Sequence, residues 1–375
     1  MTKNIDYKTV NLPPKYPIML NFDFSILQCP ITKESLSFLT KENVSEIIQK
    51  FDTSFLKFDN ISEGFVNESN TYFYPVFDDI LLLLPVYALY IGKGEDKRGK
   101  MVFDKERVFN YYNEISYNTK NSLKIYEDSA KWVDFREVSS EYISNAFSKA
   151  KRYLNPSGKY MLDIASGPIG LKEYVDLSEN YEVRICADIS VNALIQAKYN
   201  YSHREGIYIC ADITNIPLKE NVCDAVLCQH TLYHIPKNEQ KTAVNEMYRV
   251  AKPETRIVIV YNWFYHGWFM NLTLFPIQLY RVARHLAGKV YVRLVDSKPR
   301  LYFFIHNRAW FKKTFEFSSK IDFYSWRSTN KYFMSIYIHK WLGGKKLLNC
   351  LRKSEDKHPR FWGRFGDYPA IVIKK

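Results

Sequence analysis

Residues 160–170 read YMLDIASGPIG, an apolar run that passes through a carboxylate into a turn of small residues. Further apolar runs with carboxylates at one end follow at 183–188 (VRICAD), 207–212 (IYICAD) and 224–229 (DAVLCQ). Short, continuously apolar runs separated by helical patterns are typical of a parallel sheet that is covered on both faces. The stretch from 160 to 262 therefore predicts an α/β fold with a doubly wound, mostly parallel sheet.

Carboxylates stand at the ends of three of these predicted strands, at Asp163, Asp188 and Asp212. Ligands of an open α/β sheet bind beyond the carboxyl ends of its strands, so we expect the three side chains to converge there. Asp188 follows Asp163 at close to the ~20-residue offset at which a strand-end acid meets a ribose hydroxyl. The pattern favours a cofactor that carries a nucleoside, and it lacks the G-x-G-x-x-G fingerprint of dinucleotide-binding dehydrogenases.

In order and over about 100 residues, these motifs resemble those of the class I S-adenosylmethionine-dependent methyltransferases. The resemblance rests on 162–167 (LDIASG), 187–190 (ADIS), 211–213 (ADI) with 216–218 (IPL), 221–230 (NVCDAVLCQH) and 246–253 (EMYRVAKP). It implies a Rossmann-like, seven-stranded sheet with an antiparallel last strand, methyl transfer as the activity and S-adenosylmethionine as the cofactor. No metal is implied.

The same resemblance implies the cofactor contacts. Asp163 and the turn after it would hold the methionine portion, Asp188 the ribose, and Asp212 with Ile213 the adenine. The full set is Tyr112, Asp163, Ala165, Ser166, Gly167, Asp188, Ile189, Asp212, Ile213 and Gln229.

Two features of this set carry expectations of their own. Residues 109–114 (FNYYNE) resemble the aromatic helix that many small-molecule methyltransferases fold over the cofactor, which places Tyr112 at its methionine end. Packing of the same aromatic stripe on the sheet is the alternative. Ala165 and Ile169 replace the first and third glycine of the family's turn, and we expect Ala165 to be tolerated there because its φ stays negative.

The chemistry is expected after the fourth strand, at residues 229–236 (QHTLYHIP). Methyl transfer from a sulfonium is an in-line displacement, so the protein mainly aligns the reacting atoms and excludes water. Imidazole titrates nearest neutrality, so His230 or His234 can accept the proton of a protonated acceptor. Tyr233 is the third residue predicted to face the methyl group. Packing or capping is the alternative for the histidines, and a wall of the acceptor pocket is the alternative for Tyr233.

Composition and motifs divide the chain into three parts. Residues 1–94 form a β-rich module that resembles the zinc-ribbon-like Trm112 module, on 29–36 (CPITKESL) and 74–83 (YPVFDDILLL). Cys29 lacks its partner because Thr32 stands in that place, so we expect no zinc. Residues 95–158 form a helical cap, and 159–375 the methyltransferase domain, with lid insertions at about 262–315 and 327–367. Within this domain we expect Ser190 to cap one helix, Pro236 to begin another, and 368–373 (YPAIVI) to form the last strand.

Positive charge is concentrated at the C-terminal end. Residues 256–375 contain 23 Lys and Arg against 6 Asp and Glu, whereas the rest of the chain has 30 against 34. Aromatic and basic residues mixed at 332–353 favour a lid, and they leave open contact with an anionic membrane surface or a phosphorylated acceptor. Binding of nucleic acid is a further interpretation of this positive charge.

The remaining composition favours a cytoplasmic protein, with association at a membrane surface as the alternative. The N-terminus shows no secretory signal pattern. The longest apolar run, 80–91, is interrupted by Pro85 and is shorter than the ~20 residues of a spanning helix. The 6 cysteines form no C-x-x-C pair.

The sequence thus predicts a biosynthetic methyltransferase that acts on an oxygen or nitrogen atom of a small-molecule, secondary-metabolite or glycan- or lipid-linked acceptor. The alternatives are an RNA (tRNA) or protein methyltransferase, and a non-catalytic scaffold that binds S-adenosylmethionine.

Overall fold

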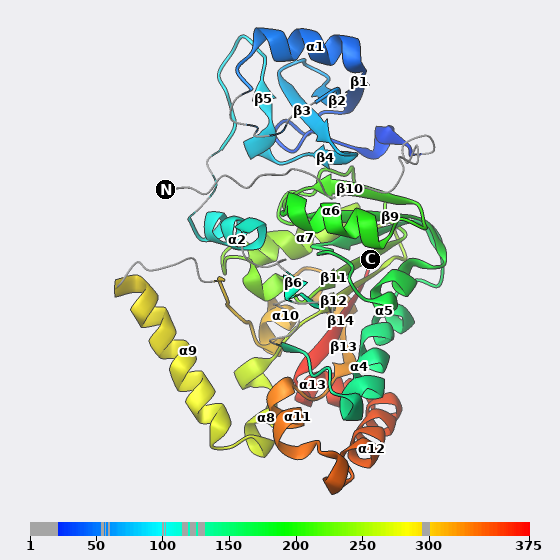
Figure 1. Ribbon diagram of the computed structural model, residues 1–375, viewed down its shortest axis with the longest axis vertical. Helices are drawn as coiled ribbons and strands as arrows, with labels where there is room; N and C mark the ends of the chain where they lie inside the picture. Colours follow the sequence, from blue (N-terminus) through cyan, green and yellow to red (C-terminus); the bar gives the residue numbers. More distant parts are fainter. Residues whose placement is uncertain are drawn as a thin grey trace.

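The computed structural model describes residues 22–53, 56, 58, 61–99, 101, 103–114, 119–120, 125–126, 132–294 and 301–375. Its centre is a twisted sheet in which seven neighbouring strands have the order β10-β9-β8-β11-β12-β14-β13 (Figure 1). These strands are β8 (Gly158–Ile164), β9 (Tyr181–Asp188), β10 (Gly206–Cys210), β11 (Ala225–Gln229), β12 (Arg256–Val260), β13 (Ile321–Arg327) and β14 (Tyr368–Lys374).

Strand directions confirm the predicted doubly wound arrangement with an antiparallel last strand. The pairs from β10 to β12 are all parallel, and β14 runs antiparallel to both of its neighbours. Every residue of β10 is buried, and so is every residue of β11 except Gln229. Continuously apolar strands form here because helices cover both faces and leave no side of the strand for polar side chains.

Helices cover the sheet on two sides. One face packs against α7 (Gln240–Val250) and α10 (Arg308–Thr314). The other face packs against α4 (Glu137–Lys149), α6 (Val191–Asn200) and α12 (Gly344–Lys357), beside the short α5 (Lys172–Val175). The Ser190 hydroxyl accepts from Ala193 N and caps α6 as predicted. Helix α7 begins at Gln240 and not at Pro236.

The N-terminal module is β-rich as expected, and it is continuous with the main sheet. Its strands are β1 (Leu36–Leu39), β2 (Glu63–Asn67), β3 (Tyr72–Phe77), β4 (Ile80–Leu82) and β5 (Leu89–Tyr90), with α1 (Lys41–Lys50) outside them. β1 to β4 pair antiparallel in sequence order, and β4 then pairs parallel with β10, Leu81 lying opposite Ile209. Residues 1–21 of this predicted module lie outside the described residues.

The segment between the module and the main sheet contains α2 (Phe103–Glu114) and a two-residue pair, β6 (Thr119–Lys120) with β7 (Ile125–Tyr126). Figure 1 places α2 beside α6 and α7, beyond one edge of the sheet. Helix α2 is held in this position by packing against α6.

The C-terminal insertions are helical. They contain α8 (Trp268–Thr273), α9 (Ile277–Leu294), α11 (Lys331–Tyr337) and α13 (Pro359–Phe365). Figure 1 shows α9 as an arm that leaves the body near α8, while α11, α12 and α13 gather at one end of the molecule. Short 3-10 turns complete the chain: Phe24–Ile26, Pro85–Tyr87, Ala150–Tyr153, Asp176–Ser178, Leu232–His234, Phe264–His266, Ser318–Lys320 and Lys340–Leu342.

Candidate cofactor and acceptor site

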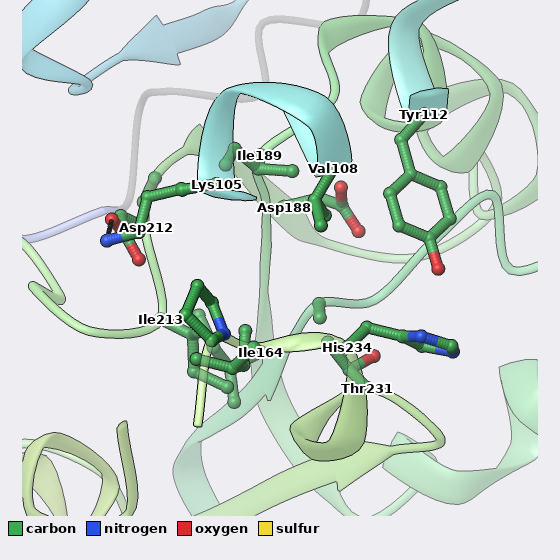
Figure 2. Close-up of a pocket in the computed structure, with 14 residues that line it drawn as sticks. Lys105, Val108, Tyr112, Ile164, Asp188, Ile189, Asp212, Ile213, Thr231 and His234 are labelled. Atoms are coloured by element: carbon green, nitrogen blue, oxygen red, sulfur yellow. Dashed lines mark hydrogen bonds and ion pairs between the residues drawn. The ribbon is translucent and has the colours of Figure 1, made fainter. Parts of the chain in front are cut away.

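A cavity lies beyond the carboxyl ends of β8, β9 and β10, and α2 crosses one side of it (Figure 2). Ile164, Ile213 and Thr231 lie across from α2. Its lining consists of Lys105, Val108, Tyr112, Ile164, Ala165, Asp188, Ile189, Ala211, Asp212, Ile213, Thr231, His234, Ile235 and Pro236. Of the residues predicted for the site, the structure brings together Tyr112, Ala165, Asp188, Ile189, Asp212, Ile213 and His234.

Asp188 ends β9 and is only 5% exposed. Its two carboxylate oxygens accept backbone N–H groups at 2.9 Å each, from Ser190 and from Gly167. Burial raises the pKa of Asp188 to about 6, although these backbone hydrogen bonds act in the opposite direction. Each carboxylate oxygen keeps a lone pair for a hydroxyl donor from the cavity.

The turn after β8 is strained at the position where the family has glycine. Ala165 has φ +60°, Gly167 +58° and Ile169 +48°, so three residues lie in the left-handed region. The expectation that Ala165 keeps a negative φ is wrong, and this conformation costs a non-glycine residue about 1–2 kcal/mol. The backbone is held in place by Ala165 N and Ser166 N, which both donate to Ala187 O. Strain maintained beside a cavity is a feature of functional sites.

Asp212 follows β10 and is engaged by a lysine of α2. Lys105 Nζ lies 2.6 Å from Asp212 Oδ2, 2.7 Å from Glu239 Oε2 and 2.9 Å from Thr214 Oγ1. Burial alone would lower the pKa of Lys105, but the two carboxylates raise it overall, so the ammonium stays charged. This cation ties α2 to the loop after β10 across the cavity.

Asp163 does not line the cavity as the other two acids do. Its carboxylate forms an ion pair with Arg184, and both side chains are at most 3% exposed. Arg184 also donates from Nη1 to Tyr174 O at 2.6 Å. The cavity lining includes the next residue, Ile164, and not Asp163. The prediction that Asp163 contacts the cofactor is therefore not supported by its position.

His234 is the one predicted catalytic residue that lines the cavity. Its Nδ1 lies 2.8 Å from Tyr302 O. A carbonyl can only accept, so Nδ1 carries the proton and Nε2 keeps the lone pair. Burial lowers the pKa of His234 to about 4, and the ring is neutral at pH 7. Figure 2 shows the Tyr112 hydroxyl pointing toward the side of the cavity where this ring lies.

The other two predicted catalytic residues pack into the protein. His230 contacts the rings of Trp326 and Tyr368 at centroid distances of 4.7 and 5.6 Å, and burial lowers its pKa to about 3. Tyr233 is 7% exposed and packs against Tyr261. Neither lines the cavity, so their positions match the packing alternative.

Three predicted cofactor residues also lie outside the lining. Ser166 and Gly167 shape the turn, and Gln229 at the end of β11 has a buried Oε1 without a partner. Sequence reasoning missed Lys105, Val108, Thr231 and Pro236. Lys105 stands one helical turn before Phe109 in the helix that the resemblance had marked, so its position on that helix was the available signal.

Cys29 of the N-terminal module is satisfied without a metal. Its Sγ lies 3.2 Å from Tyr74 Oη and accepts Thr32 N at 3.3 Å. Within the described part of the chain, no three His, Cys, Asp or Glu side chains gather as metal ligands do. Within the same part, no helix has the length and apolar character needed to cross a membrane.

Comparison with known proteins relates the central part of the chain to one family. Residues 162–259 match the "Methyltransferase domain" family. A demethylmenaquinone methyltransferase of Corynebacterium urealyticum is 27% identical over 157 residues, which are 41% of this chain and 61% of that protein. An uncharacterized protein of Methanocaldococcus jannaschii is 29% identical over 140 residues, which are 37% of this chain and 53% of that protein. The chain thus spans between half and two thirds of these relatives.

Solved structures with a similar arrangement include a SAM-dependent methyltransferase from Archaeoglobus fulgidus. That pair has 15% identity and a TM-score of 0.38, covering 63% of this chain and 94% of the other. The N-methyltransferase NodS from Bradyrhizobium japonicum has 14% identity and a TM-score of 0.30, covering 32% of this chain and 68% of the other. The family match does not extend to the N-terminal module, whose resemblance to Trm112 stays a prediction. Residues 162–259, which contain Asp188 and Asp212, are thus similar to the methyltransferase domain family.

Proposed function

We propose that this protein transfers a methyl group from S-adenosylmethionine to an oxygen or nitrogen atom of a small-molecule, secondary-metabolite or glycan- or lipid-linked acceptor. The observation that carries the proposal is the convergence of Asp188 and Asp212 on one cavity of a sheet that matches the methyltransferase domain family. The cofactor supplies an activated methyl group on a sulfonium, and the protein supplies alignment and exclusion of water.

The residues of the cavity fit an adenosyl group. Asp188 would accept the ribose hydroxyls, and the side chains of the partly buried Ile189 and the buried Ile213 would flank the adenine. Asp212 would accept from the adenine amino group beside its contact with Lys105. Thr231 and His234 would face the acceptor, with Nε2 of His234 taking a hydrogen bond from its hydroxyl or amine. A neutral imidazole of depressed pKa orients such a donor better than it removes the proton outright.

Binding of S-adenosylhomocysteine, measured by isothermal titration, tests the cavity, and loss of S-adenosylmethionine in a cell extract tests the transfer. We expect Asp188→Ala to weaken binding at least tenfold and to abolish the turnover. Glu182→Ala is the matched control, because Glu182 is an exposed residue of the same strand. Equal binding by the two variants would remove the basis of the proposal. Binding without turnover in any extract would favour the scaffold alternative, and a salt-dependent shift with bulk tRNA would favour the RNA alternative.

We further infer that the α8–α9 arm contacts an anionic lipid surface. Leu279 and Leu286 of α9 are 62% and 54% exposed, and their spacing places them on one face of the helix, while Phe275, just before α9, is 70% exposed. Helix α9 contains four Lys or Arg residues and neither Asp nor Glu. A basic helix with an exposed apolar stripe suits an anionic bilayer surface, whereas a second copy of the same arm would bring like charges together.

A basic cleft beside α8 adds to this surface. It is lined by Trp268, which is 57% exposed, together with Arg308, Lys312, Lys313 and Arg364. We expect the protein to sediment with vesicles that contain phosphatidylglycerol and not with pure phosphatidylcholine, and to be released by salt. Leu279→Glu should reduce sedimentation several-fold, while Val86→Ser, on an exposed apolar residue of the N-terminal module, should leave it unchanged. Equal sedimentation of both variants would contradict this contact.

A further inference from the structure

Several buried polar atoms without a hydrogen-bond partner gather where β13 ends and β14 begins. Among the described residues they include Trp326 Nε1, Asp367 Oδ1 and two guanidinium nitrogens of Arg327, Nε and Nη1. Trp326 and Arg327 end β13, and Asp367 directly precedes β14. β12 and β13 are both antiparallel to β14, so they run in the same direction, and the end of β13 lies at the edge that carries the cofactor cavity.

Arg327 is the centre of this group, and it is 2% exposed. Its guanidinium lies 4.6 Å from the ring centroid of Tyr368 and 5.2 Å from that of Trp326. In the described part of the chain it forms no ion pair with a carboxylate. Aromatic faces attract a cation, but they do not replace the hydrogen bonds that its N–H groups lose on burial.

Asp367 is the buried carboxylate of this group. It is 2% exposed, its Oδ2 accepts from Asn330 Nδ2 at 3.1 Å, and its Oδ1 has no hydrogen-bond partner among the described residues. Burial raises the pKa of Asp367 to about 6, and the nearby charges of Arg281 and Arg327 act in the opposite direction. Two guanidinium nitrogens and one carboxylate oxygen that lack partners among the described residues are costly in one buried cluster, since buried polar groups normally have hydrogen-bond partners.

The loop that follows β11 connects this cluster to the cofactor cavity. His230 packs on Trp326 and Tyr368, and the next residue, Thr231, lines the cavity. A ligand that contacts Arg327 would therefore lie on the other side of residues 229–231 from the cofactor. The proposed function places the acceptor beside Thr231, so this cluster is next to the proposed acceptor position.

We propose that Trp326, Arg327, Asp367 and Tyr368, here called the Arg327 subsite, bind an anionic group of the methyl acceptor, a carboxylate or a phosphate. Arg327 donates to that group through the N–H groups of Nε and Nη1, as guanidinium does to carboxylate and phosphate oxygens. Asp367 accepts from a hydroxyl or ammonium group next to it. The subsite rests on the proposed function and narrows its acceptor to one that carries negative charge.

An Arg327→Met variant tests the subsite against a purely structural role of the arginine. A guanidinium held for a ligand carries an uncompensated desolvation cost, so an apolar side chain of similar length should leave the melting temperature equal or higher without anion. A structural arginine would make the variant melt lower. Binding of S-adenosylhomocysteine should be the same in Arg327→Met and in the unmodified protein.

The probes are inorganic phosphate and acetate, titrated into the protein with S-adenosylhomocysteine present, against sodium chloride at matched ionic strength. We expect either anion to raise the melting temperature of the unmodified protein, and Arg327→Met to bind it at least tenfold more weakly. Arg256→Met is the matched control, since Arg256 is an exposed residue at the opposite end of β12. Arg327→Lys, which keeps the charge and loses the planar fork, should bind with intermediate affinity and serves if the methionine variant does not fold.

The outcomes separate this inference from the proposed function. If S-adenosylhomocysteine does not bind the unmodified protein, the proposed function fails and the subsite falls with it. If it binds, but anions stabilise Arg327→Met as much as the unmodified protein, the anion site lies elsewhere, as in the basic cleft beside α8, and only the subsite is refuted. No stabilisation by either anion refutes it as well.

Discussion

Asp188 links the burial of one carboxyl group to the pH dependence of cofactor binding. Its pKa is raised to about 6 by burial, so the carboxyl is largely protonated at pH 5 and largely ionised at pH 7. A carboxylate accepts hydrogen bonds from ribose hydroxyls more strongly than a carboxylic acid does. We therefore expect the affinity for S-adenosylhomocysteine to rise about tenfold from pH 5 to pH 7, measured by isothermal titration. Asp188→Asn should bind weakly at both pH values, and an unchanged pH dependence in that variant would assign the titration to another group.

Other residues show what local sequence can predict about a site and what it cannot. Asp188 and Asp212 reach the cavity because they are the terminal residues of apolar runs, and that position is visible in the sequence. Asp163 forms a buried ion pair with Arg184, a partner on the neighbouring strand that only the pairing of β8 with β9 brings close. His230 packs against Trp326 and Tyr368, which belong to β13 and β14, so its surroundings could not be predicted from the local sequence.

Helices and strands could be predicted from the sequence where a single pattern of residues determines them. The strands of the main sheet are short apolar runs, and β14 was expected within a residue of its observed bounds, Tyr368–Lys374. Pro236 was expected to begin a helix, but residues 236–239 form a turn in which Glu239 N donates to Pro236 O at 2.8 Å, and α7 follows it. The pairing of β4 with β10 was not predictable, since it joins residues 80–82 to 208–210 by backbone hydrogen bonds that carry no sequence signature.

At the scale of the whole molecule, that pairing makes the N-terminal module part of the main fold. One hydrophobic core contains Phe65, Tyr74 and Leu81 of the module together with residues of β8 to β12. Lys198 of α6 forms ion pairs with Asp78 and Asp79 at 3.0 and 2.7 Å. A shared core and a shared sheet predict one cooperative unfolding transition and not two.

Leu81→Ala tests this prediction, because Leu81 is fully buried and lies opposite Ile209 of β10. We expect the substitution to lower the free energy of unfolding by about 2–5 kcal/mol, measured in urea by circular dichroism and by release of bound S-adenosylhomocysteine, with both probes shifting together. Val44→Ala is the more demanding variant, because Val44 packs in a small cluster of the module alone. If the fold is one unit, Val44→Ala also shifts both probes. If it instead melts a separate module while the cofactor stays bound, the continuous sheet does not make the two parts cooperate, and the module is an independent domain that merely borders β10.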